Sequence, residues 1–249
     1  MTDARETPRW ERLDVPTAAR LEEAALAILE RTGVEVPVPE ALELLRAAGA
    51  EIDGARARIP ERLVSWALDR APKAITLHDR SGAPAIRLAG TAAYFGPGSD
   101  CLHVLDHRTG ERRRATSADL AEGLTVANAL PNMDFVMSMF LPSDLDQSLA
   151  DRHQAAEMLV RTRKPILLVT YAMAGLLDAL EMAELVAGGR EAHAARPQLA
   201  VYVNVTRGLQ FNEDSVHKLL LCAARGIPAM WIPVTSGGTT GPITLGGTM

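Results

Sequence analysis

The sequence predicts an α/β fold in which helices cover a parallel sheet. From residue 133 onwards, short and nearly continuous apolar runs alternate with amphipathic segments of helical period, which is typical of repeated βα units. Before residue 130 the order is different: helical segments come first, and short runs of alternating apolar and polar residues follow. These two patterns predict an N-terminal region of helices and β-hairpins over residues 1–130 and a βα-repeat region over residues 131–249.

Three helices are expected at the start of the N-terminal region. Residues 16–36 repeat leucine, alanine and isoleucine on one helical face, and Gly33 is suited to end that helix. Residues 38–53 repeat the design and end at Gly49. Residues 59–72 form a third, shorter helix that a proline closes.

Short strands in hairpins are expected next. They lie in residues 74–80, 85–96 and 101–116, with a turn at 106–113. Residues 116–132 return to a helical pattern, with Thr116 or Ser117 as the N-cap and Asp119 in the first turn.

The βα-repeat region is expected to contain four strands and three complete helices. The strands lie at 133–142, 164–172, 197–206 and 227–235, and the helices at 144–163, 175–189 and 212–226. Such a set is half of an eight-stranded barrel, or most of a small doubly wound sheet. No glycine fingerprint of the dinucleotide type follows the first strand, so the sequence gives no support to a dinucleotide site.

Polar residues gather where these strands end. They are Ser138 and Asp144, Thr170 and Tyr171, Asn204 and Thr206, and Thr235 and Ser236. In both architectures ligands bind at the carboxyl ends of the strands, so the sequence predicts a binding site there without naming its substrate.

Composition argues against several classes of function. The net charge of −5 offers no basic field for nucleic acid, and the apolar runs are too short and interrupted to span a membrane. The first residues are charged and polar, unlike a signal peptide, which favours the cytoplasm. The two cysteines lie far apart in the sequence and do not suggest a disulfide framework.

Four stretches in order carry a resemblance to a known family. They are "ALAILERTGVEV" at 25–36, the run 41–80 from "ALELLRAAGAEID" to "ITLHDR", the run 94–136 beginning "YFGPGSDCLHVLDHRTGERRRATSADL", and "AARGIPAMWIPVTSGGTTGPITLGG" at 223–247. The chain resembles the N-terminal half of the trimethylamine methyltransferase family. That family includes trimethylamine enzymes that contain pyrrolysine and betaine-type enzymes that lack it, and we expect the betaine-type branch.

The resemblance implies a TIM-type (β/α)8 barrel of which about four βα units are present, with the "GGTTGPITLGG" loop following the fourth strand. The chain is therefore expected to be a fragment of a longer one. The implied reaction moves a methyl group from a methylated amine to the cobalt of a corrinoid (cobalamin) held by a separate corrinoid protein. We expect the protein to hold no tightly bound cofactor and no metal ion of its own, and we expect it to form a homo-oligomer. The rival interpretations are a TIM-type enzyme that binds an anionic substrate through residues 236–241, and a non-catalytic half-barrel assembly module.

The candidate substrate-binding residues lie in three places, and none is assigned a catalytic role. Tyr94 and Phe95 either face a quaternary ammonium group or pack into a core, and Gly96 and Ser99 follow in a turn that a ligand could approach closely. Tyr171, Asn204 and Thr206 lie at the rim, where the last two either bind a carboxylate or the corrinoid, or are satisfied inside the barrel. Ser236, Thr239 and Thr240 form a loop that either binds an anion at a helix start or simply packs closely.

Other reactive residues favour structural roles. Cys101 and His103 share one strand face, which is weak support for a metal, and Cys222 is expected in a core. Three histidines on helices are expected in solvent, and three aspartates are expected to cap and open the helix after the strand at 133–142. They are His153, His193 and His217, and Asp144, Asp146 and Asp151.

Overall fold

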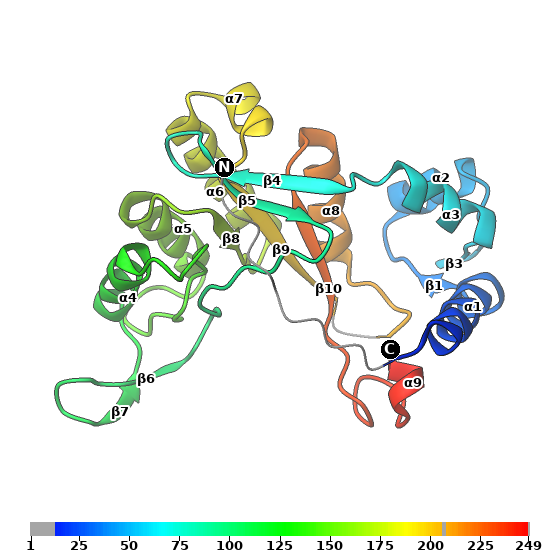
Figure 1. The fold of residues 1–249 in the computed structure, drawn as a ribbon, viewed down its shortest axis with the longest axis horizontal. Helices are drawn as coiled ribbons and strands as arrows, with labels where there is room; N and C mark the ends of the chain where they lie inside the picture. Colours follow the sequence, from blue (N-terminus) through cyan, green and yellow to red (C-terminus); the bar gives the residue numbers. More distant parts are fainter. Residues whose placement is uncertain (1–12, 206–207, 249) are drawn as a thin grey trace. The chain divides into compact units, whose positions relative to one another are not determined.

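The computed structural model describes residues 13–205 and 208–248 (Figure 1). The described residues form two compact units. Unit 1 comprises residues 74–202 and 222–230, and unit 2 comprises residues 13–73, the described part of 203–221, and residues 231–248. The α/β class expected from the sequence is confirmed, and the described residues form no closed barrel. Among those residues, no helix combines the length and the apolar character needed to cross a membrane.

Unit 2 contains the three helices expected near the N-terminus. They are α1 (Val15–Arg31), α2 (Pro39–Ala47) and α3 (Glu61–Arg70). Gly33 ends α1 at φ +71°, and a Cβ there would lie 2.3 Å from the carbonyl oxygen of Ala57, so only glycine fits. Helices α1 and α2 pack on a small antiparallel sheet in the order β1-β3-β2, which the sequence analysis did not predict. Its strands, β1 (Val34–Glu35), β2 (Glu51–Asp53) and β3 (Arg56–Arg58), are too short to show a period.

Unit 1 opens with the two expected hairpins and the expected helix. The hairpins pair β4 (Ala74–His78) with β5 (Pro84–Ala89), and β6 (His103–Leu105) with β7 (Arg112–Arg114). Helix α4 (Ser117–Ala129) follows, with Thr116 as its N-cap in a capping box with Asp119. The hairpin of β4 and β5, cyan in Figure 1, packs on the parallel sheet, because Leu77 and Ile86 share a core with Leu167 and Ala200.

The parallel sheet has the order β10-β9-β8, with strands β8 (Ile166–Leu168), β9 (Leu199–Val205) and β10 (Ala229–Pro233). The strand expected at 133–142 is not a regular strand. It contributes one parallel bridge to β8, between Val136 and Ile166, and a second parallel bridge joins Phe140 to Cys101, after an interruption where Met139 adopts φ +58°. That segment therefore continues the sheet beside β8 through a single bridge.

The helices after the sheet strands agree with the sequence analysis, with one addition. The expected helices are α5 (Ala150–Arg161), α6 (Met173–Ala187) and α8 (Glu213–Arg225), and the short α9 (Leu245–Thr248) closes the described chain. Helix α7 (Arg190–Ala195) was not expected, because Gly188 ends α6 in a left-handed conformation and only six helical residues follow. His193 on α7 is 1% exposed, so its expected exposure to solvent is wrong.

Candidate substrate-binding site

Four polar side chains of unit 1 meet where the strand segments end. The carboxylate oxygen Oδ1 of Asp100 accepts hydrogen bonds from the Ser138 hydroxyl at 3.0 Å, the Gln154 amide at 3.2 Å and the Tyr171 hydroxyl at 2.9 Å. We call these four residues the Asp100 cluster. Ser138 lies two residues after the bridge to β8, and Tyr171 lies three residues after β8 ends. The cluster therefore occupies the carboxyl ends of neighbouring parallel segments, where α/β proteins bind ligands.

Asp100 reaches the cluster because its segment runs parallel to residues 134–141. Backbone hydrogen bonds join Met139 N–H to the Gly98 carbonyl at 3.1 Å and Cys101 N–H to the Met139 carbonyl at 2.9 Å. Asp100 itself adopts φ +58°, a left-handed conformation that aspartate tolerates better than most side chains. The carboxylate position is thus determined by the backbone on both sides of it.

Helix α5 supplies the buried part of the site. Asp151 and Gln154 are three residues apart and therefore lie on the same helical face. Gln154 is fully buried, and its amide nitrogen also donates to the Phe140 carbonyl at 2.8 Å. Both neighbours are acceptors, so the orientation of the amide is determined by them. Its oxygen Oε1 is buried without a hydrogen-bond partner in the described part of the chain.

Tyr171 joins the site to solvent, because 45% of its surface is exposed. Partial burial, the negative charge of Asp100 and the hydrogen bond to it raise the pKa of the Tyr171 hydroxyl above its ordinary value. The phenol therefore keeps its proton at neutral pH and acts as a donor to Asp100.

The second carboxylate nearby, Asp151, is neutralised within the chain. It is 2% exposed, accepts from the Tyr171 backbone N–H at 3.1 Å, and forms an ion pair with Arg152 at 3.4 Å. Arg152 also pairs with Asp178 on α6. A Cβ on Gly175 would lie 2.0 Å from Oδ2 of Asp151, so this glycine makes room for the carboxylate at the start of α6. Asp151 thus positions the backbone of Tyr171.

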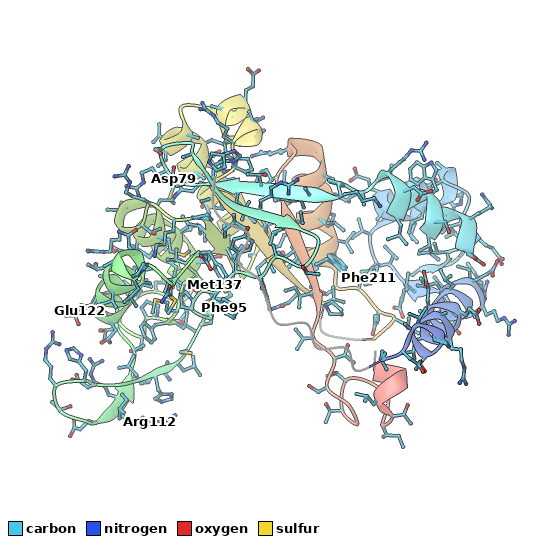
Figure 2. All side chains as sticks on the ribbon, viewed as in Figure 1. Asp79, Phe95, Arg112, Glu122, Met137 and Phe211 are labelled. Atoms are coloured by element: carbon cyan, nitrogen blue, oxygen red, sulfur yellow. The ribbon has the colours of Figure 1, made fainter. Side chains whose placement is uncertain are left out.

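The aromatic pair Tyr94 and Phe95, expected either to face a ligand or to pack into a core, lies outside the cluster. The Tyr94 hydroxyl accepts from Arg87 N–H at 3.1 Å and donates to the Arg87 carbonyl at 3.2 Å, and its ring packs with the core around Leu77. Phe95 is 65% exposed, and its backbone bonds to Asp134, at the beginning of the segment whose end carries Ser138. Figure 2 labels Phe95.

Two further predicted residues lie in the turn between this pair and Asp100. A Cβ on Gly96 would lie 2.6 Å from the Phe135 ring, so this glycine permits close packing. Ser99 is half-buried and adjoins Asp100. Of the candidate substrate-binding residues in unit 1, the structure brings Tyr171 into the cluster, where it joins Ser138, which was expected among the polar residues at the strand ends.

The remaining predicted residues belong to unit 2. Asn204 is exposed, and its carbonyl accepts from the Ser215 hydroxyl at 2.6 Å. Thr206 lies outside the described residues. The exposed loop of Ser236, Thr239 and Thr240 bonds mainly to itself: Ser236 N–H donates to the Thr240 hydroxyl at 2.8 Å, and the Thr239 hydroxyl donates to the Ser236 carbonyl at 3.1 Å.

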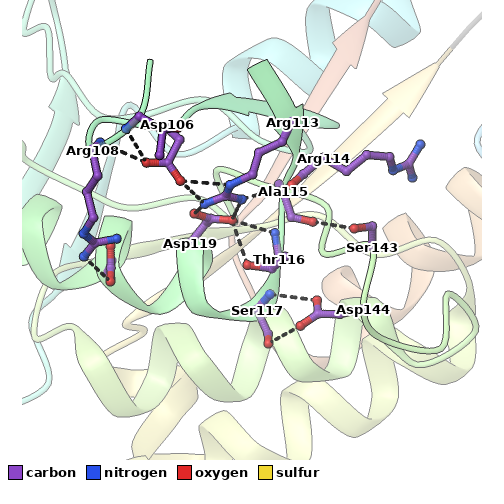
Figure 3. Close-up of polar contacts among 12 residues, drawn as sticks. Asp106, Arg108, Arg113, Arg114, Ala115, Thr116, Ser117, Asp119, Ser143 and Asp144 are labelled. Carbon is purple, nitrogen blue, oxygen red and sulfur yellow. Dashed lines mark hydrogen bonds and ion pairs between the residues drawn. The ribbon is translucent and has the colours of Figure 1, made fainter. Parts of the chain in front are cut away.

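A separate polar network, shown in Figure 3, holds the start of α4. Arg113 bridges Asp106 and Asp119, at 2.9 and 2.7 Å, and its bond to Asp119 holds the pKa of that carboxyl well below its usual range. Asp144 accepts from the Ser117 backbone N–H at 2.8 Å. Asp144 therefore supports α4, and the expectation that it caps the following helix is wrong. Asp146 bonds to Ser148 in the turn before that helix.

The two cysteines and the possible metal ligands are the remaining reactive residues that the sequence analysis considered. Cys222 is buried, as expected, and Cys101 is exposed. Within the described ranges no three His, Cys, Asp or Glu side chains are grouped so that they could hold a metal ion.

Asp100 and Gln154 were missed by the sequence analysis. Asp100 ends a glycine- and proline-rich turn that reads as a connection between strands. A signal for Gln154 was available, because Asp151 and Gln154 interrupt the face of α5 that carries Ala155 and Met158, and polar residues on a buried face need partners.

An α/β chain with a half-buried carboxylate and an aromatic hydroxyl at its strand ends has the features of a small-molecule enzyme. The chain belongs to the trimethylamine methyltransferase (MTTB) family, whose profile matches residues 2–249.

The chain is similar to three proteins that are all named as methyltransferases. It is 29% identical over 228 residues to the trimethylamine methyltransferase MttB of Desulfitobacterium hafniense (strain DSM 10664 / DCB-2), covering 91% of this chain and 46% of that protein. It is 25% identical over 245 residues to the glycine betaine methyltransferase of D. hafniense (strain Y51), and the match covers 97% of this chain and 50% of that protein. A proline betaine:corrinoid methyltransferase of Eubacterium limosum is 30% identical over 151 residues, and the match covers 58% of this chain and 30% of that protein. The chain spans about half the length of the first two relatives.

Proposed function

We propose that the protein to which this chain belongs transfers a methyl group from a methylated amine to the cobalt of a corrinoid carried by a partner protein. The amine is trimethylamine or a betaine-type quaternary amine. The observation that carries the proposal is the family match over nearly the whole chain, together with relatives named for trimethylamine, glycine betaine and proline betaine. The corrinoid in the name of the third relative supports the same kind of partner here.

The chain would supply half of a TIM-type (β/α)8 barrel, residues 131–249, after an N-terminal domain of residues 1–130. The order of the sheet supports this architecture, because the segment around Val136 bridges β8, and β9 and β10 follow in chain order. The homo-oligomer and the cytoplasmic location expected from the sequence stay predictions.

The residues at the strand ends fit a positively charged amine. Asp100 offers a carboxylate and Tyr171 an exposed ring, and methylated ammonium groups bind to negative charge and aromatic faces. The corrinoid supplies the cobalt nucleophile when its protein docks. The task left to the residues of this chain is to bind the amine as a cation, whose nitrogen leaves as a neutral amine, and to hold one methyl group toward the partner.

The test is a demethylation assay on the complete protein with a reduced corrinoid protein from the same organism. Trimethylamine, glycine betaine and proline betaine are each supplied, with glycine as the unmethylated blank. We expect one methylated amine to be converted to its demethylated product, measured by mass spectrometry, and the absorbance of the reduced corrinoid to fall in parallel. If no methylated amine loses a methyl group while the corrinoid stays reduced, the proposed function is wrong.

A further inference from the structure

Asp100 is a carboxylate at the strand ends whose charge is not balanced by any cationic side chain among the described residues. It is half-buried, and within the described ranges no Lys, Arg or His side chain forms an ion pair with it. Asp151 at the same rim pairs with Arg152, and Asp119 at the start of α4 pairs with Arg113. A carboxylate that is partly removed from water and lacks a cation costs free energy, which a cationic ligand would offset.

The hydrogen bonds around Asp100 leave one of its oxygens available. The three donors of the cluster all bond to Oδ1, and across the described part of the chain no hydrogen bond or ion pair reaches Oδ2. The donors are a serine, a glutamine and a tyrosine, all neutral, so they orient the carboxylate without cancelling its charge. The cluster therefore presents a fixed negative charge at the rim.

The surroundings of Asp100 suit a cation that cannot donate a strong hydrogen bond. The Tyr171 ring is held by its hydroxyl bond to Asp100 and remains partly exposed, so one of its surfaces can receive a ligand. The buried oxygen Oε1 of Gln154 has no donor within the described residues. The methyl groups on a charged nitrogen are polarised and contact carboxylates, amide oxygens and ring faces without N–H or O–H donors.

We propose that Asp100 is the anionic partner of the substrate's methylated ammonium group and that the Tyr171 ring contacts the same group. The proposal rests on the function given above and names the residues that would recognise its substrate class. Ser138 and Gln154 are positioning residues, because they act by holding the Asp100 carboxylate.

The test measures binding without any corrinoid. Tetramethylammonium, the smallest quaternary ammonium probe, is titrated calorimetrically into the complete protein. Three proteins are compared: wild type, Asp100→Asn, and Asp146→Asn. The first substitution removes the charge with little change of shape. The second makes the same chemical change in the loop before α5, where Asp146 is exposed and its carboxylate accepts hydrogen bonds from the backbone N–H and the hydroxyl of Ser148.

We expect Asp100→Asn to weaken tetramethylammonium binding at least tenfold and Asp146→Asn to leave it within twofold of wild type. Because Asp100 is hydrogen-bonded in the fold, circular dichroism checks each variant. Should Asp100→Asn not fold, Tyr171→Leu decides, with at least a fivefold loss expected from removal of the ring. Equal binding by wild type and the folded variant, or no binding by wild type at millimolar probe, overturns the proposal.

This outcome is separate from that of the demethylation assay. If wild type demethylates an amine but Asp100→Asn binds tetramethylammonium normally, the reaction stands and the Asp100 assignment is wrong. If binding depends on Asp100 but no amine is demethylated, the cation site stands and the proposed reaction is wrong.

Discussion

At the scale of single residues, two titratable side chains of unit 1, His193 and Asp100, lie in opposite kinds of environment. His193 is buried on α7, and burial lowers the pKa of its imidazole from 6.5. Its nitrogen Nε2 has no hydrogen-bond partner among the described residues, so nothing there favours the charged form through that atom. Asp100 is the reverse case, a charged group held by three donors. The first residue is expected to matter for stability and the second for binding.

The His193 environment makes a prediction about acid stability. Since its pKa is lower in the folded state, the unfolded chain binds the proton more readily, and folding stability falls as pH decreases below about 6.5 through the folded pKa. His193→Leu removes this titration. Chemical denaturation at pH 7.5 and pH 5.5 should show a smaller loss of unfolding free energy in the variant than in wild type. His107→Gln, at an exposed position in the β6–β7 turn, should behave as wild type. Equal acid sensitivity of His193→Leu and wild type would show that His193 does not titrate as inferred.

Residues also show the limit of sequence reasoning. Tyr171 was placed correctly at a strand end because a short apolar run followed by polar residues identifies a rim. Asp100 could not be placed there from the sequence, since its position depends on pairing with a segment about forty residues later. His193 was misassigned because charged neighbours in sequence favour solvent exposure, whereas its burial depends on the packing of the short helix α7 against α6, which the sequence does not reveal.

At the scale of elements, helix caps and glycine stops gave the most reliable predictions. Gly33 and the box of Thr116 and Asp119 mark helix ends through local geometry, which sequence alone determines. The strand at 133–142 failed because a left-handed Met139 and a single bridge to Ile166 arise from tertiary packing. Local signals were therefore confirmed where the interaction partners are close in sequence.

The start of α4 carries the prediction at this scale. Asp119 accepts from the Thr116 backbone N–H and hydroxyl, each at 2.8 Å, and pairs with Arg113. Asp119→Ala should lower the free energy of unfolding by about 1 kcal/mol, the usual cost of losing a cap. Because the Asp119 pKa is lowered, its contribution is present above pH 3.8 and is lost as pH falls further. The difference between variant and wild type should therefore shrink on acidification.

Urea denaturation of both proteins between pH 7 and pH 3 measures this difference. Asp69→Ala, at an exposed position on α3, serves as the control and should change stability by less than about 0.5 kcal/mol. A difference that stays constant down to pH 3 would mean that the Asp119 carboxylate does not act through its charge.

At the scale of the whole molecule, the parallel sheet and the hairpins should differ in local stability. All three residues of β8 are buried, and the strand bonds to its neighbours on both sides, through Val136 and through β9. The hairpin of β6 and β7 is different: Leu105 is exposed, and a groove of about 450 Å³ lies between this hairpin, α4 and the segment around Met139. Local opening costs least where few apolar groups are buried.

Hydrogen exchange of the complete protein tests this distribution. Amides of β8 and of residues 199–202 in β9 should exchange slowest, and those in the β6–β7 turn, residues 106–111, should exchange at least a hundredfold faster. Leu167→Ala removes a buried side chain of β8 and should lower the free energy of unfolding by about 2–5 kcal/mol. Exchange of the sheet amides should accelerate by the factor that corresponds to this loss, and exchange of the turn amides should accelerate far less. Exchange in the turn as slow as in β8 would contradict the prediction and show that another part of the protein or a second subunit covers the groove, so that the hairpin belongs to an interface.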